Sequence, residues 1–166
     1  MDLIVAVGAD WGIGCEGDLL FSIPEDMKYF RTMTQGKVVV MGRKTLESLP
    51  GGKPLKNRTN IVLSQNPDYA VEGAQVCQSL DEVRKAVRAY AEDDVMVLGG
   101  AGIYRALLPY CKRAYVTHVE ATAPADTYFP DLTKEPGWAL VKEGEQQEHE
   151  GLRYRFCVYE NSAVKA

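Results

Sequence analysis

The stretch DVMVLGGAGIYRALL, residues 94–108, decides how this chain folds. Residues 94–100 form an apolar run of strand length that ends in two glycines, and residues 101–108 place apolar side chains at helical spacing. An apolar run without strict alternation is typical of a strand that is buried on both faces of a parallel sheet. The stretch therefore predicts a strand, a turn and a helix of an α/β fold.

The rest of the chain repeats this alternation of strands and helices. Besides residues 94–100, the predicted strands are residues 3–9, 37–42, 59–64, 74–78, 113–122, 138–145 and 153–160. Besides residues 101–108, the predicted helices are residues 23–34, 44–49 and 79–91, the last of which opens with the capping box Ser79-Leu80-Asp81-Glu82. No helix separates the last two strands, so we expect them to form an antiparallel hairpin at one edge.

The expected fold class is therefore α/β. We predict a single domain, residues 1–166, with a mostly parallel central sheet of about eight strands, flanking helices and a C-terminal antiparallel hairpin. In such a sheet, ligands bind beyond the carboxyl ends of the parallel strands.

The composition excludes several classes of protein. Of the 166 residues, 46% are hydrophobic and 25% charged, which is ordinary for a globular domain and excludes a disordered or fibrous chain. The longest apolar run, residues 3–7, is far short of the roughly 20 residues of a membrane span. A net charge of −4 argues against non-specific binding to nucleic acid or to an anionic membrane.

The sequence gives no indication of export or of metal binding. Asp2 stands near the start, and no basic segment precedes an apolar region. The cysteines lie far apart, with no CxxC motif, and the chain has only two histidines. We therefore expect a cytoplasmic protein with reduced thiols and no metal site.

The predicted helix over residues 23–34 carries an acid among apolar side chains. Asp26 lies on the stripe formed by Ile23, Met27, Phe30 and Met33. One interpretation is that Asp26 only favours the helix dipole in the first turn. The other is a carboxylate held in an apolar cleft, where a planar ligand with two parallel N–H donors would meet it through two hydrogen bonds.

Two further segments have features of an anion-binding site, and a third has the length of a functional lid. Residues 97–104 (VLGGAGIY) place glycines between a strand and a helix, where free amides and the helix dipole attract phosphate; the alternative is a tight turn. Residues 41–45 (MGRKT) put two cations and a hydroxyl past a strand end, and Ser64 and Gln65 end a neighbouring strand; the alternative is solvated loop charge. Residues 10–21 (DWGIGCEGDLLF) read as a long loop, which is typical of a functional lid.

Together, these segments resemble dihydrofolate reductases of the bacterial type over residues 3–159. The matching stretches, in order, are IVAVGADWGIG, IPEDMKYF, VVVMGRKTLESL, LKNRTNIVLS, VMVLGGAGIY, YVTHV and ADTYFPD. Each is weak alone, but their order and spacing are highly specific. The resemblance implies NADPH-dependent reduction of 7,8-dihydrofolate to tetrahydrofolate, which supplies one-carbon metabolism.

The resemblance assigns the substrate side. Asp26 matches the acid that pairs with the pterin 2-amino group and ring nitrogen, Thr117 the hydroxyl that joins it, and Arg58 the arginine that binds the α-carboxylate of the glutamate tail. The catalytic candidates are thus Asp26 and Thr117. The remaining substrate-binding candidates, which match apolar walls, are Ile4, Val5, Met27, Phe30, Leu49, Leu55 and Leu98. Antifolates of the diaminopyrimidine class should bind through the same acid.

The resemblance also assigns the cofactor side, and it favours NADPH over NADH. Residues matching the nicotinamide end are Ala6, Ile13 and Gly14. Residues matching the turn beside the pyrophosphate and nicotinamide ribose are Gly99, Gly100, Ala101, Gly102, Ile103 and Tyr104. Residues matching the 2′-phosphate and adenosine site are Arg43, Lys44, Thr45, Ser64 and Gln65. The expected partners are small molecules, and the expected oligomeric state is a monomer.

The sequence departs from the family pattern beside the predicted lid. Phe21 stands where a tryptophan is usual, Leu20 replaces a common proline, and Ala125 stands where a bacterial relative can have glycine. Residues 50–56 also differ from many relatives, which leaves the contacts of Lys53 and Lys56 to the glutamate tail open.

Two alternative functions fit part of the sequence. A reductase of the riboflavin pathway on the same fold would share the cofactor side, but Asp26 and Arg58 favour folate. A non-catalytic nucleotide-binding module would explain the glycine turn and the basic strand ends, but not an acid on an apolar helix face.

Overall fold

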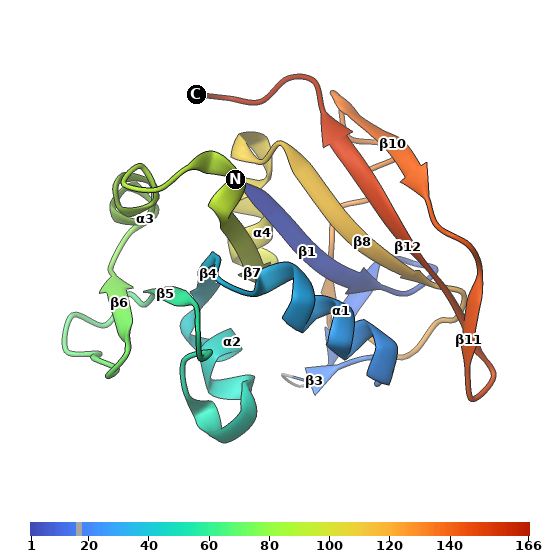
Figure 1. Cartoon of the computed structure of the whole chain (residues 1–166), viewed down its shortest axis with the longest axis horizontal. Helices are drawn as coiled ribbons and strands as arrows, with labels where there is room; N and C mark the ends of the chain where they lie inside the picture. Colours follow the sequence, from blue (N-terminus) through green and yellow to red (C-terminus); the bar gives the residue numbers. More distant parts are fainter. Residues whose placement is uncertain (16–17) are drawn as a thin grey trace.

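One large sheet forms the centre of the protein (Figure 1). The computed structural model describes residues 1–15 and 18–166. The sheet runs in the order β10-β12-β8-β1-β7-β4-β5-β6, and β11 pairs with β12. Its strands are β1 (Asp2–Val7), β4 (Val38–Gly42), β5 (Thr59–Leu63), β6 (Ala74–Cys77), β7 (Val95–Gly99), β8 (Arg113–Val119), β10 (Trp138–Glu143), β11 (Gln147–His149) and β12 (Leu152–Asn161).

The strand directions confirm the predicted fold class. The neighbours from β8 to β6 are parallel, whereas β12 is antiparallel to β8, β10 and β11. The expected C-terminal hairpin is present as β10 and β12, with β10 at the edge. The segment that joins the two strands contains β11, which was not predicted and which extends the ladder along β12.

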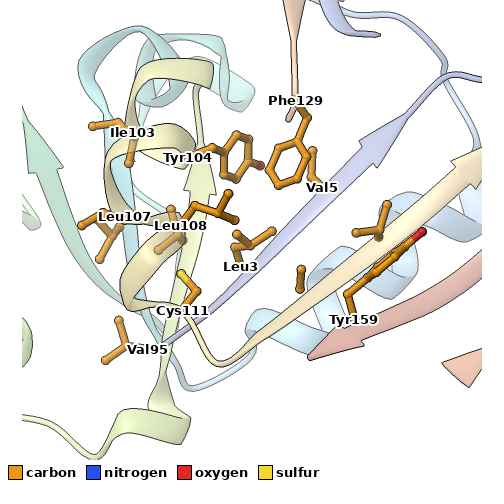
Figure 2. Close-up of a cluster of buried hydrophobic side chains, with 14 of the residues drawn as sticks. Leu3, Val5, Val95, Ile103, Tyr104, Leu107, Leu108, Cys111, Phe129 and Tyr159 are labelled. Carbon is orange, nitrogen blue, oxygen red and sulfur yellow. The ribbon is translucent and has the colours of Figure 1, made fainter. Parts of the chain in front are cut away.

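Both faces of the central strands β1, β4 and β7 are covered, as their apolar runs predicted, whereas β10 at the edge is largely exposed. The helices are α1 (Pro24–Thr34), α2 (Arg43–Ser48), α3 (Leu80–Val87) and α4 (Ala101–Leu107), with short 3-10 helices over Pro50–Gly52, Glu92–Asp94 and Leu108–Tyr110. Leu3 and Val5 of β1 pack in the cluster that includes α3 and α4 side chains, and Ile4 packs in the cluster that includes α1 and α2 side chains. Figure 2 shows Tyr104 of α4 beside Phe129 in the first cluster, with ring centroids 5.1 Å apart.

Helix α3 is shorter than predicted. It ends at Val87 rather than near residue 91, because the following side chains, including Tyr90, are exposed and gain nothing from packing. The predicted cap is present, since Ser79 Oγ accepts from Glu82 N at 3.1 Å. The Glu82 carboxylate, however, accepts from Gln78 N at 2.7 Å, one residue before the expected amide.

A second, small antiparallel sheet was not predicted. It consists of β3 (Asp18–Leu19), β2 (Gly12–Cys15) and β9 (Thr127–Tyr128), so the segment read as a loop is partly strand. Residues 16 and 17 of that segment lie outside the described residues. A Cβ on Gly14 would lie 2.9 Å from Thr127 Oγ1, so the glycine permits β2 to approach β9. Strands this short, with glycines, carry no hydrophobic period that would reveal them.

None of the helices in the described ranges is long and apolar enough to cross a membrane.

Candidate active site

The candidate residues gather where the parallel strands end. Gly99 ends β7, Gly42 ends β4, and Ser64 follows β5. Ala6, near the end of β1, is paired in register with Thr117 of β8. The register thus places the ends of neighbouring strands at one edge of the sheet, the position at which open α/β sheets bind ligands.

A short hydrogen bond joins the two catalytic candidates. Thr117 Oγ1 donates to Asp26 Oδ1 at 2.6 Å, although 91 residues separate them in sequence. Asp26 comes from the first turn of α1, and Thr117 is buried in β8. Burial raises the pKa of the Asp26 carboxyl, and the Thr117 hydroxyl opposes this by stabilising the ionised form. The pair is therefore a hydrogen-bonded carboxylate in an apolar setting.

Most of the apolar substrate candidates lie together between α1 and the sheet. One cluster contains Ile4 and Leu98, with Phe30, Leu49 and Leu55 packed against it. Val5 belongs to the cluster on the opposite face, because successive side chains of β1 alternate. Met27, on the exposed side of α1, has 40% of its surface accessible, which leaves it available to a ligand.

An aromatic stack that the sequence reasoning missed ties α1 to the sheet. Tyr29 stacks on Phe156, with ring centroids 4.2 Å apart and ring planes at 28°. Phe156 is paired with Thr117 in the β8–β12 ladder, so the stack lies next to the Asp26–Thr117 pair. The pKa of Tyr29 is raised to about 12, mainly because the side chain is partly buried. Tyr29 follows Asp26 by three residues, and this helical spacing is the signal that could have identified it.

Arg58 is fixed at the C-terminal end of α1 by neutral acceptors. Its guanidinium donates to the carbonyl oxygens of Lys56 (2.7 Å) and Arg31 (2.8 Å) and, through two nitrogens, to Thr34 Oγ1 (3.3 and 3.1 Å). These contacts use four of the five N–H donors of an arginine, so a two-bond grip on a carboxylate requires that one contact be exchanged. Burial and the charge of Arg31 lower the pKa of Arg58. Thr34, the residue that holds it, was not identified from the sequence.

The turn from β7 into α4, at Gly99 and Gly100, is closely packed, and we call it the β7–α4 corner. The Gly99–Gly100 peptide is cis, and Gly99 has φ of +116°, a conformation that favours glycine. A Cβ on Gly99 would lie 2.9 Å from the ring of Tyr104. The Tyr104 hydroxyl donates to the carbonyl oxygens of Ile4 (2.6 Å) and Leu98 (2.8 Å), so this cofactor candidate supports the corner from its buried side.

The two segments with phosphate-binding character lie side by side. A Cβ on Gly100 would lie 3.6 Å from Thr45 Oγ1, and one on Gly42 would lie 3.5 Å from Ile103 Cγ1. In the described residues, α4 begins with no side-chain cap, and the space around the Gly102 Cα is open. The first turn of α4, which includes Ala101, therefore presents its amides in a form that an anion can approach.

Cations and hydroxyls surround this corner. Arg43 and Lys44 are exposed at the start of α2, where Arg43 forms a 3.4 Å ion pair with Glu47. Ser64 is buried and Gln65 exposed after β5. This set of amides, cations and hydroxyls fits the phosphate groups of a dinucleotide.

The small sheet borders the same edge. Ile13 and Gly14 lie on β2, and Ile13 packs against the cluster that contains Val5. A Cβ on Gly12 would lie 3.0 Å from both Leu20 Cδ1 and Ala125 Cβ, two positions at which the sequence departs from the family pattern. Phe21 packs with Ile23, Val119 and Tyr154. The side chain that replaces the usual tryptophan thus fills a third apolar cluster.

Comparisons with known proteins identify the family of this chain. The chain matches the family described as dihydrofolate reductase over residues 1–161. It is 40% identical to dihydrofolate reductase of Neisseria meningitidis serogroup B (95% of each chain) and 36% identical to that of Bacillus subtilis (96% of this chain and 94% of the relative). Its fold resembles that of Enterococcus faecalis dihydrofolate reductase complexed with NADP(H) and RAB-propyl, with a TM-score of 0.86, 33% identity and coverage of 96% and 95%.

Proposed function

The chain belongs to the dihydrofolate reductase family and is an NADPH-dependent reductase of 7,8-dihydrofolate, and from this premise we propose roles for its residues. The two alternatives raised by the sequence, a riboflavin-pathway reductase and a non-catalytic nucleotide-binding module, find no support in the comparisons. The bound NADPH supplies the hydride, so the protein is left to position the substrate, exclude water and favour one protonation state.

Asp26 is the group that we propose to bind the pterin. Its carboxylate accepts two hydrogen bonds, one from the 2-amino group and one from the adjacent ring nitrogen, in the arrangement that suits a planar donor pair. The observation that carries this proposal is the 2.6 Å bond from buried Thr117, which fixes one oxygen of a carboxylate whose pKa is raised by burial.

The charge of Asp26 is also proposed to favour protonation of the pterin at N5. The carboxylate stabilises positive charge that develops on the ring, and we propose that water delivers the proton. Ile4, Leu98 and Phe30 exclude bulk water from the ring and thereby strengthen this electrostatic effect.

The cofactor side is proposed to hold NADPH through shape and charge. The amides of the first turn of α4 and Thr45 hold the pyrophosphate, and Arg43, Lys44, Ser64 and Gln65 hold the 2′-phosphate and adenosine. The test is the oxidation of NADPH and of NADH, each with and without dihydrofolate. We expect oxidation that depends on dihydrofolate and prefers NADPH. Absence of dihydrofolate-dependent oxidation contradicts the function, and equal use of NADH contradicts the 2′-phosphate site.

Arg58 is proposed to bind the α-carboxylate of the glutamate tail. Because the guanidinium lies outside the pterin-binding pair, Arg58→Leu should raise the KM for dihydrofolate by roughly 10- to 100-fold, the effect of one lost charged hydrogen bond or two, with a small change in kcat. Steady-state kinetics with both substrates measures this. A loss of NADPH affinity without a change in the KM for dihydrofolate would show that the tail assignment is wrong.

The remaining expectations follow from the same site. We propose that diaminopyrimidine antifolates bind through Asp26 and compete with dihydrofolate, since their two parallel N–H donors match the carboxylate. We also propose that residues 1–166 act as a single-domain monomer in the cytoplasm. Competition kinetics tests the binding of antifolates, and light scattering of the purified protein tests whether it is a monomer. Cell fractionation tests the cytoplasmic location.

A further inference from the structure

Three aromatic rings from three parts of the fold meet where the small sheet begins. Trp11 lies between β1 and β2, His118 near the end of β8, and Tyr159 near the end of β12. The rings of Trp11 and His118 are nearly perpendicular, at 85°, with 5.0 Å between their centroids. The Tyr159 ring lies 5.8 Å from that of His118 and 6.2 Å from that of Trp11. Each ring is therefore close enough to the other two to interact with them.

His118 is half-buried, and a hydrogen bond fixes its ring. Its Nε2 and the hydroxyl oxygen of Tyr159 are 2.8 Å apart, and the neutral ring either accepts or donates this bond, depending on its tautomer. The charged groups around the ring are Glu143 of β10, Asp131 and Arg155, its register partner on β12. The two carboxylates favour the protonated ring, but burial has the larger effect and lowers the pKa of His118 below its ordinary 6.5. The ring is therefore neutral at pH 7.

Trp11 has a main-chain conformation that its surroundings must hold. Its φ is +65°, in the left-handed region that residues other than glycine rarely adopt. Its N–H donates to Gly8 O, and its carbonyl oxygen accepts from Phe129 N, each at 2.9 Å. The Phe129 ring also stacks on the indole, with 6.2 Å between centroids. Since such a conformation persists only where several contacts fix it, the contact with His118 contributes to holding it.

The position of Trp11 determines where β2 begins. Gly12 follows it directly, and Ile13 and Gly14 of β2 are the residues that match the nicotinamide end of the cofactor. A rotation of the Trp11 main chain would move these residues together, because they are adjacent in one short strand. A displacement of about 1 Å in the groups that position a reactant can slow a reaction by about 100-fold.

We propose that His118 is a positioning residue for hydride transfer: bonded to Tyr159, it holds Trp11 and thereby keeps β2 in place against the bound nicotinamide. The inference rests on the proposed function. The pair that binds the pterin is separate, because Thr117 and His118 are successive residues of β8 and point to opposite faces of the strand. A change at His118 should therefore affect the rate of hydride transfer and not the binding of dihydrofolate.

The kinetic test compares His118→Leu, which loses the hydrogen bond, with His118→Gln, whose amide can replace it. In His118→Leu, single-turnover hydride transfer should slow about five-fold, the effect of one neutral hydrogen bond, while the KM for dihydrofolate changes less than about two-fold. His118→Gln should recover most of the rate. Tyr159→Phe removes the same bond with a smaller change of shape and should slow hydride transfer equally. The double variant of His118→Leu and Tyr159→Phe should be no slower than either alone.

Fluorescence tests the contact between Trp11 and His118 independently. The chain has two tryptophans, so Trp138→Phe leaves Trp11 as the one indole. A protonated imidazole quenches an indole in contact with it, so the emission of Trp11 should fall in acid with a midpoint below 6.5. This change should be absent in His118→Gln and kept in the matched control His149→Gln, which removes the other histidine.

Three results would overturn the proposal. If His118→Leu is less stable in urea but transfers hydride at the normal rate, the ring cluster serves only to pack the core. A slow rate that His118→Gln does not recover shows that the hydrogen bond is not what positions Trp11, and emission that does not vary with pH shows that the two rings are not in contact. All three leave the proposed function intact, whereas a folded, unmodified protein that does not oxidise NADPH with dihydrofolate contradicts that function itself.

Discussion

The α1 face and the β7–α4 corner border the same edge of the sheet but differ in construction. On α1, an acid is held in apolar surroundings, and nearby Met27 has 40% of its surface exposed. At the corner, Tyr104 is only 5% exposed, and its hydroxyl binds two main-chain carbonyls. The α1 face keeps chemical groups available at a cost in stability, whereas the corner maintains a backbone shape. The difference predicts that changes on α1 affect turnover and changes at the corner affect stability.

The largest expected effect is on turnover, in Asp26→Asn. The neutral amide keeps the size of the side chain but loses the charged contact with the pterin, which should cost on the order of 2–5 kcal/mol in kcat/KM at neutral pH. NADPH binding should persist, because the cofactor side lies at the other corner. Turnover should recover in part at low pH, where the substrate is already protonated.

A pH profile of kcat/KM, together with a titration of NADPH binding, measures this. Unchanged turnover across the pH range would show that Asp26 does not bind the pterin, and loss of NADPH affinity would show that the two regions are not independent.

Gly99→Ala should cause the largest loss of stability. The added methyl group would lie 2.9 Å from the Tyr104 ring at a φ of +116°, so both strain and crowding oppose it, and we expect a loss of about 2–4 kcal/mol. Gly102→Ala is the matched control, because it has open space within α4 and should stabilise the protein by about 0.5–1 kcal/mol. Urea unfolding of both variants measures the effect, and similar stabilities would contradict the description of the corner.

Tyr104→Phe should have a smaller effect at the same corner. Without the hydroxyl, the carbonyl oxygens of Ile4 and Leu98 lose their shared donor, which should cost about 1–3 kcal/mol of stability. Tyr90→Phe, on an exposed side chain, is the control. If the two variants unfold at the same urea concentration, the Tyr104 hydroxyl contributes nothing to the corner.

The smallest expected effect is a pH dependence of the free energy of unfolding that arises from Asp26 on α1. Burial raises the pKa of Asp26 above its ordinary 3.8, so the folded state binds its proton more tightly than the unfolded chain does. The free energy of unfolding should therefore fall as pH rises from 3.8 through the raised pKa. Asp26→Asn should be more stable than the unmodified protein at neutral pH, and the difference should shrink in acid.

Unfolding curves at several pH values test this, with Glu25→Gln, a change at the exposed neighbouring position, as the control. A difference between Asp26→Asn and the unmodified protein that does not vary with pH would show that the Asp26 carboxyl is not destabilised by burial.

The sequence predicted those elements whose own residues form a recognisable hydrophobic pattern, and it missed the short elements that have none. Sequence patterns predicted every strand of the main sheet except β11, and the Pro24 start predicted α1. The signal was strongest for β1, β4 and β7, because burial on both faces leaves a continuous hydrophobic pattern. Strands β2, β3, β9 and β11 were missed because two to four residues with glycine or polar side chains have no readable period. At the site, Asp26 was identified by its place on an apolar stripe, whereas Thr34 and Phe156 have no local feature that sets them apart.

The sequence alone determined the α/β class, the order of the main elements, the acid on α1 and the glycines after β7, because each depends on interactions between residues close together in the chain. Only the tertiary structure decided that Thr117 reaches Asp26, that Thr34 holds Arg58, and that Trp11 packs against His118. These contacts depend on which strands become neighbours and in which register. That choice minimises the free energy of the whole core, and no short segment encodes it.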